Sequence, residues 1–256
     1  MLSGAFSSIS KISRIKCADM CLQTSCLSIN YHSQNEECQL NTDSPYTNPV
    51  IVQEVQDWAI YFLQKDNDWE MVFRAMSNNG LRTADAWMGT PPPPTPVEEG
   101  CRLLTTSSTC TSIYRSEHLN TWNSENISEV KLELYKAGVR VVNIRFDGKG
   151  SNYIDWFGTN RLIDSGWKTM SKSRLFEHFS IYGFCWRKFY INQSFGGCSN
   201  DQGWMVVIDV NLESCSCRYD IQSDRPAFLF APGEDITRWN NHNYDRADVL
   251  AIFIKR

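Results

Sequence analysis

The cysteines are the residues of this sequence best placed for chemistry, either as crosslinks or as metal ligands. Ten of the 256 residues are cysteine, an even number that is high for a cytosolic protein and ordinary for an extracellular one. A zinc site would need cysteine and histidine clustered at spacings of about two to four residues, and neither His178 nor His242 stands in such a cluster. We therefore interpret the cysteines as disulfides and predict no metal and no cofactor.

Few other side chains suggest catalysis. The four histidines stand in unrelated surroundings, and the sequence lacks the nucleophile-elbow, zinc-protease, phosphate-loop and dinucleotide-binding motifs. Asp147 and Asp155 could act as the acid and base of a glycosidase if the fold brings them together. We expect a protein that binds rather than an enzyme, with a secreted hydrolase as an alternative.

Charge and composition limit the partners. The net charge of −4 comes from 25 basic and 29 acidic residues in scattered positions, which gives no electrostatic attraction to nucleic acid or to an anionic membrane. No stretch approaches the roughly 18 apolar residues of a transmembrane helix. Residues 1–16 lack the continuous apolar core of a signal peptide. Because the cysteines indicate secretion, we expect the natural start to lie upstream.

Four cysteines are concentrated near the amino end, and they are Cys17, Cys21, Cys26 and Cys38. If the segment around the first two is helical, their sulfurs lie one turn apart on one face. Apolar and polar residues alternate over residues 27–32, which predicts a strand. A helix and a strand joined by disulfides is the expected unit, although four cysteines allow three connectivities.

This region resembles the PAN/apple domain, a secreted module in which a helix is tethered to a curved antiparallel sheet. Besides the cysteines, the resemblance rests on the flanking residues Ser28-Ile29-Asn30-Tyr31, Gln39-Leu40-Asn41, Trp58 and Tyr61. It implies the disulfides Cys17–Cys38 and Cys21–Cys26 in a domain over residues 1–65, part of whose first strand we expect to precede Met1. Apple modules in general bind proteins or carbohydrates.

A second domain is predicted over residues 66–256, after the polar joint at residues 65–68. A hairpin is predicted over residues 130–146, and turn signals recur about every ten residues, which favours an antiparallel sandwich. The other predicted strands are residues 69–75, 179–182, 187–192, 204–210, 227–230 and 249–254. Short helices are predicted only at residues 159–165 and 172–177. The expected fold class is α+β, mostly antiparallel β, with a small disulfide-crosslinked PAN/apple domain followed by a larger β-sandwich-like domain.

The proline-rich segment has two interpretations. Residues 91–94 are four consecutive prolines and must adopt the extended polyproline II conformation. They could be a ligand for a proline-recognising domain or a stiff surface loop, and an extracellular setting favours the loop. We treat residues 89–108 as a surface excursion of the second domain, pinned by Cys101 and Cys110.

The remaining cysteines allow a partial pairing. Cys185 is the expected partner of Cys198, thirteen residues later. Cys215 and Cys217 are too close to pair comfortably with each other, so we expect them to pair with Cys101, Cys110 or another nearby cysteine. Asp201 and its neighbours could offer oxygens to calcium, but the segment lacks the spaced acidic series of a calcium loop, and we favour a tight turn held by Cys198.

Two further kinds of residue bear on binding. Asn126 and Asn192 each begin an N-glycosylation sequon. Exposed tryptophans would stack on sugars, whereas buried ones are core residues whose N–H needs a partner. Trp156 and Trp239 stand near turns and are our candidates for a ligand-binding surface.

The second domain has a resemblance of its own. It is similar to a region that follows an apple domain in extracellular proteins of corals and other marine invertebrates, which are recovered from the coral skeletal organic matrix. The matching segments are residues 69–75, 114–116, 130–138, 189–192, 196–198 and 203–207. The resemblance implies a secreted, glycosylated matrix component that binds extracellular matrix proteins or glycans and takes part in biomineralisation. A lectin-like protein is the alternative. The net charge of −4 is far below that of the acidic runs expected in a protein that templates mineral directly.

Overall fold

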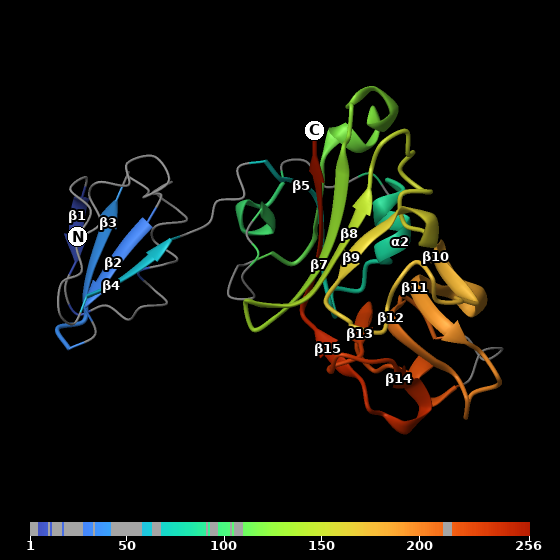
Figure 1. The fold of residues 1–256 in the computed structure, drawn as a ribbon. Coiled ribbons are helices and arrows are strands. Elements are labelled where there is room, and N and C mark those ends of the chain that lie inside the picture. Colours follow the sequence, from blue (N-terminus) through green and yellow to red (C-terminus); the bar gives the residue numbers. More distant parts are fainter. Residues whose placement is uncertain are drawn as a thin grey trace. The chain divides into compact units, whose positions relative to one another are not determined.

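The computed structural model consists of two compact units, residues 1–67 and residues 68–256 (Figure 1). It describes residues 5–9, 11, 17, 28–32, 34–41, 58–62, 68–90, 92, 97–102, 104, 110–211 and 217–256. The division between the units falls in the polar segment where the sequence analysis places a domain boundary.

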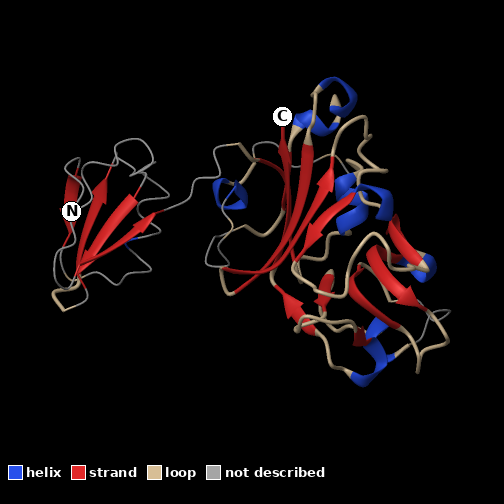
Figure 2. Ribbon diagram, in the orientation of Figure 1, coloured by secondary structure: helices blue, strands red, loops and turns tan. Residues whose placement is uncertain are grey.

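The amino-terminal unit is a four-stranded antiparallel sheet with the strand order β1–β3–β2–β4 (Figure 2). Its strands are β1 (Ala5–Ile9), β2 (Ser28–His32), β3 (Glu37–Asn41) and β4 (Trp58–Phe62). The hairpin of β2 and β3 pairs Ser28 with Asn41 and His32 with Glu37. The strand that alternation predicts after Cys26 is therefore confirmed as β2.

A disulfide ties β3 of this sheet to the segment between β1 and β2. Cys17 and Cys38 are bonded, with their Cα atoms 5.7 Å apart, and both are fully buried. This is one of the two pairs that the resemblance implies. The other, Cys21–Cys26, lies outside the described residues, and so does all of the expected helix except Cys17, which is helical.

The larger unit contains two six-stranded antiparallel sheets (Figure 2). The first sheet has the order β6–β5–β16–β7–β8–β9 and consists of β5 (Glu70–Met76), β6 (Ile113–Arg115), β7 (Glu129–Lys136), β8 (Val139–Asp147), β9 (Leu162–Ser165) and β16 (Val249–Lys255). The second has the order β10–β11–β12–β13–β15, with β14 also paired to β12, and consists of β10 (His178–Tyr182), β11 (Arg187–Ser194), β12 (Gln202–Ile208), β13 (Ala227–Phe230), β14 (Thr237–Arg238) and β15 (Asp245–Ala247). The prediction of a mostly antiparallel β fold is confirmed.

The helical segments that the structure describes in the larger unit are short. They are α2 (Thr83–Trp87) and the 3-10 turns η2 (Glu99–Arg102), η3 (Glu117–Leu119), η4 (Trp122–Ser124), η5 (Thr159–Arg161), η6 (Phe184–Trp186), η7 (Arg218–Asp220) and η8 (Trp239–Asn241). None of the helices in the described part of the chain is long and apolar enough to span a membrane.

Of the two helices predicted from sequence, the first is confirmed only over its first three residues and the second is wrong. Residues 159–165 form η5 and then β9, because Leu162 and the residues after it pair with the edge strand β8. Residues 172–177 form turns and no helix. That segment instead delivers Phe176 to the core, where its ring lies 5.2 Å from those of Phe179 and Trp204.

One hydrophobic core is shared by both sheets. Phe73 and Ile252 from the first sheet and Val207 and Phe228 from the second belong to the same buried cluster. Trp87 of α2 lies within it, with its ring centroid 5.4 Å from that of Phe73 and 6.3 Å from that of Phe189. This helix therefore contacts side chains of both sheets.

Each sheet is also covered on its outer face. In β16, Ile252 enters the shared core, whereas Ala251 and Phe253 pack with Trp69 on the other side of the sheet. In β12, Val206 packs on the outer face against Tyr219. Burial of both faces explains why these strands are continuous apolar runs without polar alternation.

The outer face of the second sheet buries a charged network centred on Arg187. Its guanidinium donates two hydrogen bonds to Asp220, of 3.0 and 2.9 Å, and lies 3.1 Å from a carboxylate oxygen of Asp201. Asp201 in turn accepts hydrogen bonds from the hydroxyl groups of Tyr190 and Tyr219. All five side chains are buried, so each charge depends on these partners for the solvation it has lost.

We predict that Arg187→Ala destabilises the larger unit by about 3–5 kcal/mol, because two carboxylates remain buried without their cation. Chemical denaturation of the full chain, followed by near-ultraviolet circular dichroism, measures this loss. Arg238→Ala, at an exposed position of β14, is the control. A loss for Arg187→Ala no larger than that of the control would contradict the structural role of the network.

Glu125 joins the end of the chain to η3 and η4. Its carboxylate accepts hydrogen bonds from the hydroxyl of Thr121 at 2.6 Å and from Arg256 at 2.8 Å, and its Oε1 lies 2.9 Å from Nδ1 of His118. The hydroxyl of Thr121, then His118 and Arg256, lower the pKa of Glu125 from 4.5 to about 2. The stability that Glu125 contributes is therefore complete above about pH 4.5 and is lost as pH falls toward 2.

We predict that Glu125→Gln makes the melting temperature less dependent on pH between about 4.5 and 2. Thermal melts of the full chain at a series of pH values provide the measurement. Glu117→Gln changes an exposed carboxylate close by and should leave the dependence as it is. An identical acid dependence in the wild type and Glu125→Gln would refute the assignment.

Candidate functional site

The structure contradicts the two tryptophans predicted to bind ligand. Trp156 and Trp239 are fully buried. The ring centroid of Trp156 lies 5.2 Å from that of Phe146, within the shared core. The indole N–H of Trp239 donates to Asn192 at 3.1 Å. Their position near turns misled the prediction, because these turns lie over the core with the indoles directed inward.

The sequon at Asn192 is also contradicted as a glycosylation site. Asn192 is fully buried, and its amide nitrogen donates to Asp201 at 2.9 Å and to the carbonyl of Ser194 at 3.0 Å. A glycan on that nitrogen would break both hydrogen bonds and would have no space. Asn126, in contrast, is exposed, with a positive φ of 51°, and its position is compatible with modification.

The predicted disulfide Cys185–Cys198 is wrong. Cys198 is bonded to Cys217, with 5.2 Å between their Cα atoms. The fold brings these two cysteines together, because Cys198 packs on the outer face of the second sheet in the same cluster as Cys217. Cys185 is itself disulfide-bonded. Cys215 lies outside the described residues.

The excursion after Gly89 is closed by the disulfide Cys101–Cys110, whose Cα atoms lie 4.7 Å apart. Most of the proline run lies outside the described residues. Glu98 and these two cysteines form the one group in the described ranges with the spacing of metal ligands. Because the sulfurs are bonded to each other, they are not thiolates, and Glu98 instead accepts hydrogen bonds from Thr111 at 2.9 and 3.1 Å.

Asp201 does not have the geometry of a calcium ligand. Its carboxylate is fully buried, and both oxygens accept hydrogen bonds or an ion pair from Arg187, Tyr190, Asn192 and Tyr219. Four protein donors already surround this carboxylate, so the segment around it is an anchored turn.

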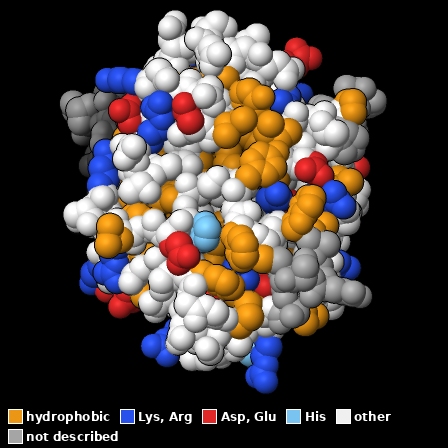
Figure 3. Space-filling view, turned by 90° about the vertical axis from the view of Figure 1, so that its right-hand side faces the viewer, with side chains coloured by type: hydrophobic (Ala, Val, Ile, Leu, Met, Phe, Trp, Pro, Cys, Tyr) orange, Lys and Arg blue, Asp and Glu red, His pale blue; other side chains and the backbone are white. Residues whose placement is uncertain are grey.

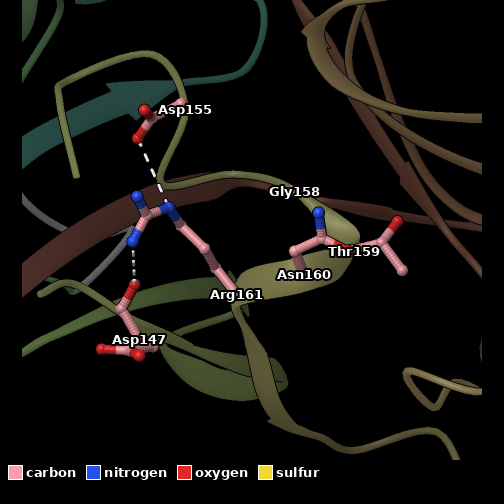
Figure 4. Close-up of a pocket in the computed structure, with 6 residues that line it drawn as sticks. All are labelled: Asp147, Asp155, Gly158, Thr159, Asn160 and Arg161. Atoms are coloured by element: carbon pink, nitrogen blue, oxygen red, sulfur yellow. Dashed lines mark hydrogen bonds and ion pairs between the residues drawn. The ribbon is translucent and has the colours of Figure 1, made fainter. Parts of the chain in front are cut away.

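The structure does bring Asp147 and Asp155 to one pocket, of about 610 Å³ (Figure 4). Arg161 extends between them: its Nε lies 3.4 Å from Asp155, and its Nη1 donates to the carbonyl of Asp147 at 3.3 Å. The same guanidinium donates to the carbonyls of Lys149 and Gly150. Arg161 thus holds the loop that carries both carboxylates.

Both carboxylates are also engaged within that loop. Asp147 accepts a hydrogen bond from the amide of Lys149 at 3.0 Å, and Asp155 accepts two from Asn152, both at 2.9 Å. These contacts assign the pair a role in shaping the loop around Arg161.

An exposed aromatic surface lies at residues 182–186, from the last residue of β10 to the residue before β11, and we call this segment the aromatic turn. Three of its five residues have large, exposed side chains: Tyr182 at 44%, Phe184 at 49% and Trp186 at 54%. Figure 3 shows hydrophobic side chains gathered on the side of the unit where β10 and β11 lie. Among the tryptophans of residues 68–256, all of which the structure describes, Trp186 alone is exposed.

The backbone holds the aromatic turn in one shape. The amide of Gly183 donates to the carbonyl of Arg187 at 2.8 Å, and a Cβ added at Gly183 would lie only 2.8 Å from Tyr190. Cys185 and Trp186 adopt positive φ angles of 59° and 62°, which are costly for residues with side chains and are concentrated at functional sites. The disulfide at Cys185 adds a covalent restraint.

Lys188 lies between two of these rings. Tyr182 pairs directly with Lys188 across the strands, and the Lys188 ammonium lies 4.4 Å from the ring centroid of Tyr182 and 5.2 Å from that of Trp186. A cation at this distance from a ring is attracted to its electron-rich face. We call Tyr182, Trp186 and Lys188 the aromatic clamp.

Two carboxylates, Asp85 of α2 and Asp209 directly after β12, act on the clamp through their charges. Burial lowers the pKa of Lys188, and the charges of Asp209 and Asp85 oppose that shift. Burial raises the pKa of Tyr182, and the same two carboxylates add to it. Asp209 also caps α2, since it accepts hydrogen bonds from the amides of Thr83 at 2.8 Å and Ala84 at 3.0 Å. Because α2 contacts β11, this cap fixes the start of α2 near the strand that carries Lys188.

Sequence analysis missed this site, although a signal was present. Phe184, Cys185 and Trp186 stand between two predicted strands, where a turn is normally polar. Large apolar residues at the tip of a hairpin would have indicated a binding surface.

The comparisons with known proteins identify one part of the chain. Residues 1–65 match the family model of the PAN domain. No curated protein and no solved structure has significant similarity to the chain. The amino-terminal unit thus contains a PAN domain, a type of module that suggests protein or carbohydrate binding.

Proposed function

We propose that this protein is a secreted component of an extracellular matrix and acts by binding proteins or glycans. The observation that carries the proposal is a PAN domain in the same chain as a disulfide-crosslinked β unit that exposes an ordered aromatic surface. Such disulfides form in oxidising compartments outside the cytosol. Two binding surfaces on one chain would let the protein connect matrix components.

The sequence resemblance to skeletal matrix proteins of corals supports a finer proposal, that the matrix is a mineralising one. With a net charge of −4, the chain would organise other macromolecules around the mineral and would not itself template it. Our first hypothesis for how the protein binds is adhesion to matrix proteins through the sheet of the PAN domain.

Our second hypothesis is that the protein is a lectin-like receptor, and the exposed ring of Trp186 favours this. A catalytic function is less well supported. Asp147 and Asp155 share a pocket, but both accept hydrogen bonds inside their own loop, and Arg161 lies between them. We therefore propose that the protein is not an enzyme.

Peptide mapping of the protein purified from its natural location, without reduction, tests the compartment. We expect peptides crosslinked through Cys198–Cys217 and Cys101–Cys110, and a glycan at Asn126 but none at Asn192. The glycan is expected only at Asn126 because Asn192 is buried and hydrogen-bonded. Free thiols throughout the purified protein would rule out a secreted matrix component.

Retention of the labelled full chain on isolated organic matrix tests binding. We expect Trp186→Ala to weaken retention roughly tenfold, as for a buried aromatic at an interface. Leu175→Ala is the matched control: Leu175 is 87% exposed, and its neighbour Arg174 bonds Gln193 near the opposite end of β11. If the wild type is retained no better than an unrelated disulfide-bonded protein, the binding function is wrong.

A further inference from the structure

We propose that the aromatic clamp is a binding site for a neutral saccharide, with Arg82 and Asp85 as its hydrogen-bonding partners. The inference rests on the proposed binding function and assigns a ligand class to one surface of the larger unit. It follows from the faces of the two rings, the polar groups beside them and the balance of charge.

The rings leave their outer faces available. Lys188 occupies the space between Tyr182 and Trp186 and lies against one face of each ring. Both rings are nevertheless about half exposed, at 44% and 54%, so the remaining surface faces solvent. A pyranose carries aliphatic C–H groups on one face, and this face can cover an aromatic ring while the hydroxyl groups stay hydrogen-bonded.

The clamp is ordered before a ligand arrives. Lys188 is only 8% exposed, so it acts as a fixed spacer between the rings. Gly183 closes the turn, and Cys185 is held by a disulfide. Binding therefore costs little further ordering of side chains, which matters for a ligand with a small contact area.

Polar partners stand beside the rings. Asp85 lies in α2, and this helix contacts β11, the strand that carries Lys188. Asp85 forms an ion pair with Arg82 at 3.4 Å, and the two side chains are 39% and 55% exposed. A carboxylate and a guanidinium together accept from and donate to neighbouring hydroxyl groups, which is the pattern a sugar requires.

The charges near the clamp balance. The cations are Lys188 at the rings and Arg82 beside them, and the anions are Asp85, which pairs with Arg82, and Asp209, which caps α2. Such a surface offers no net attraction to a sialylated, sulfated or uronic-acid sugar. The small size of the exposed aromatic surface, which belongs to one five-residue segment, also favours a sugar over a protein. A stable protein interface needs on the order of 800 Å² per partner.

The test measures binding of the full chain to an array of neutral, sialylated and sulfated glycans, followed by titration calorimetry with the best neutral oligosaccharide. We expect neutral glycans to be retained. We expect Trp186→Ala and Tyr182→Ala to weaken binding roughly tenfold or more, Trp186→Phe to retain part of the affinity, and Asp85→Asn to weaken it several-fold. Leu175→Ala should bind as the wild type does.

Thermal melts establish that each variant is folded, and substitutions of exposed side chains should leave the melting temperature nearly unchanged. Retention of charged glycans only, or equal affinity of Trp186→Ala and the wild type, would overturn the proposal. A blank array together with matrix retention that depends on Trp186 would overturn the saccharide and leave the binding function intact, with a protein as the partner.

Discussion

The buried guanidinium of Arg187 is the interaction on which the exposed surface of the larger unit depends. It is the first residue of β11 and follows the aromatic turn directly. Its hydrogen bonds to Asp220 and its ion pair with Asp201 join β11 to the segments on the outer face of the second sheet. The neighbours of Arg187 in the chain are Trp186 and Lys188, so the anchor that fixes Arg187 also fixes two members of the aromatic clamp.

The energetics of this anchor explain its composition. Burial alone would lower the pKa of Arg187. The hydrogen bonds that its guanidinium donates to Asp220, together with the electrostatic effect of Tyr190 and Tyr219, raise this pKa above the ordinary value. The arginine therefore remains a cation inside the protein. The Cys198–Cys217 disulfide lies beside it, with Cys217 Sγ 3.6 Å from the guanidinium. Covalent and ionic restraints thus meet under the turn that exposes Trp186.

Local patterns in the sequence predicted most of the strands. The β7–β8 hairpin follows from alternating residues on both sides of a glycine turn, and β13 and β16 follow from short apolar runs between turn signals. The continuous apolar character of β16 also reflects covered faces on both sides of the sheet, which alternation cannot reveal. Helices were predicted where Leu162 and Phe176 instead enter a strand and the core. In both places, tertiary contacts decided between the conformations.

The site could not be predicted in the same way. Whether Trp156, Trp239 and Asn192 are exposed depends on residues distant in the chain, and packing buries all three. The disulfide partner of Cys198 depends on which loop crosses the second sheet. The number of residues between two cysteines does not reveal which loop this is. The amino-terminal unit was accessible from sequence because cysteine spacing and flanking strand residues together form a family pattern, and residues 1–65 match the PAN domain.

Oxidative footprinting of tryptophans by mass spectrometry, on the free full chain and on the chain bound to isolated matrix, tests the central claim most directly. In the free protein, Trp186 should be oxidised far faster than Trp156, Trp204 and Trp239, because it is exposed and they are buried. On the matrix, Trp186 should become protected. Equal oxidation of Trp186 in the free and bound states would show that the aromatic clamp takes no part in binding.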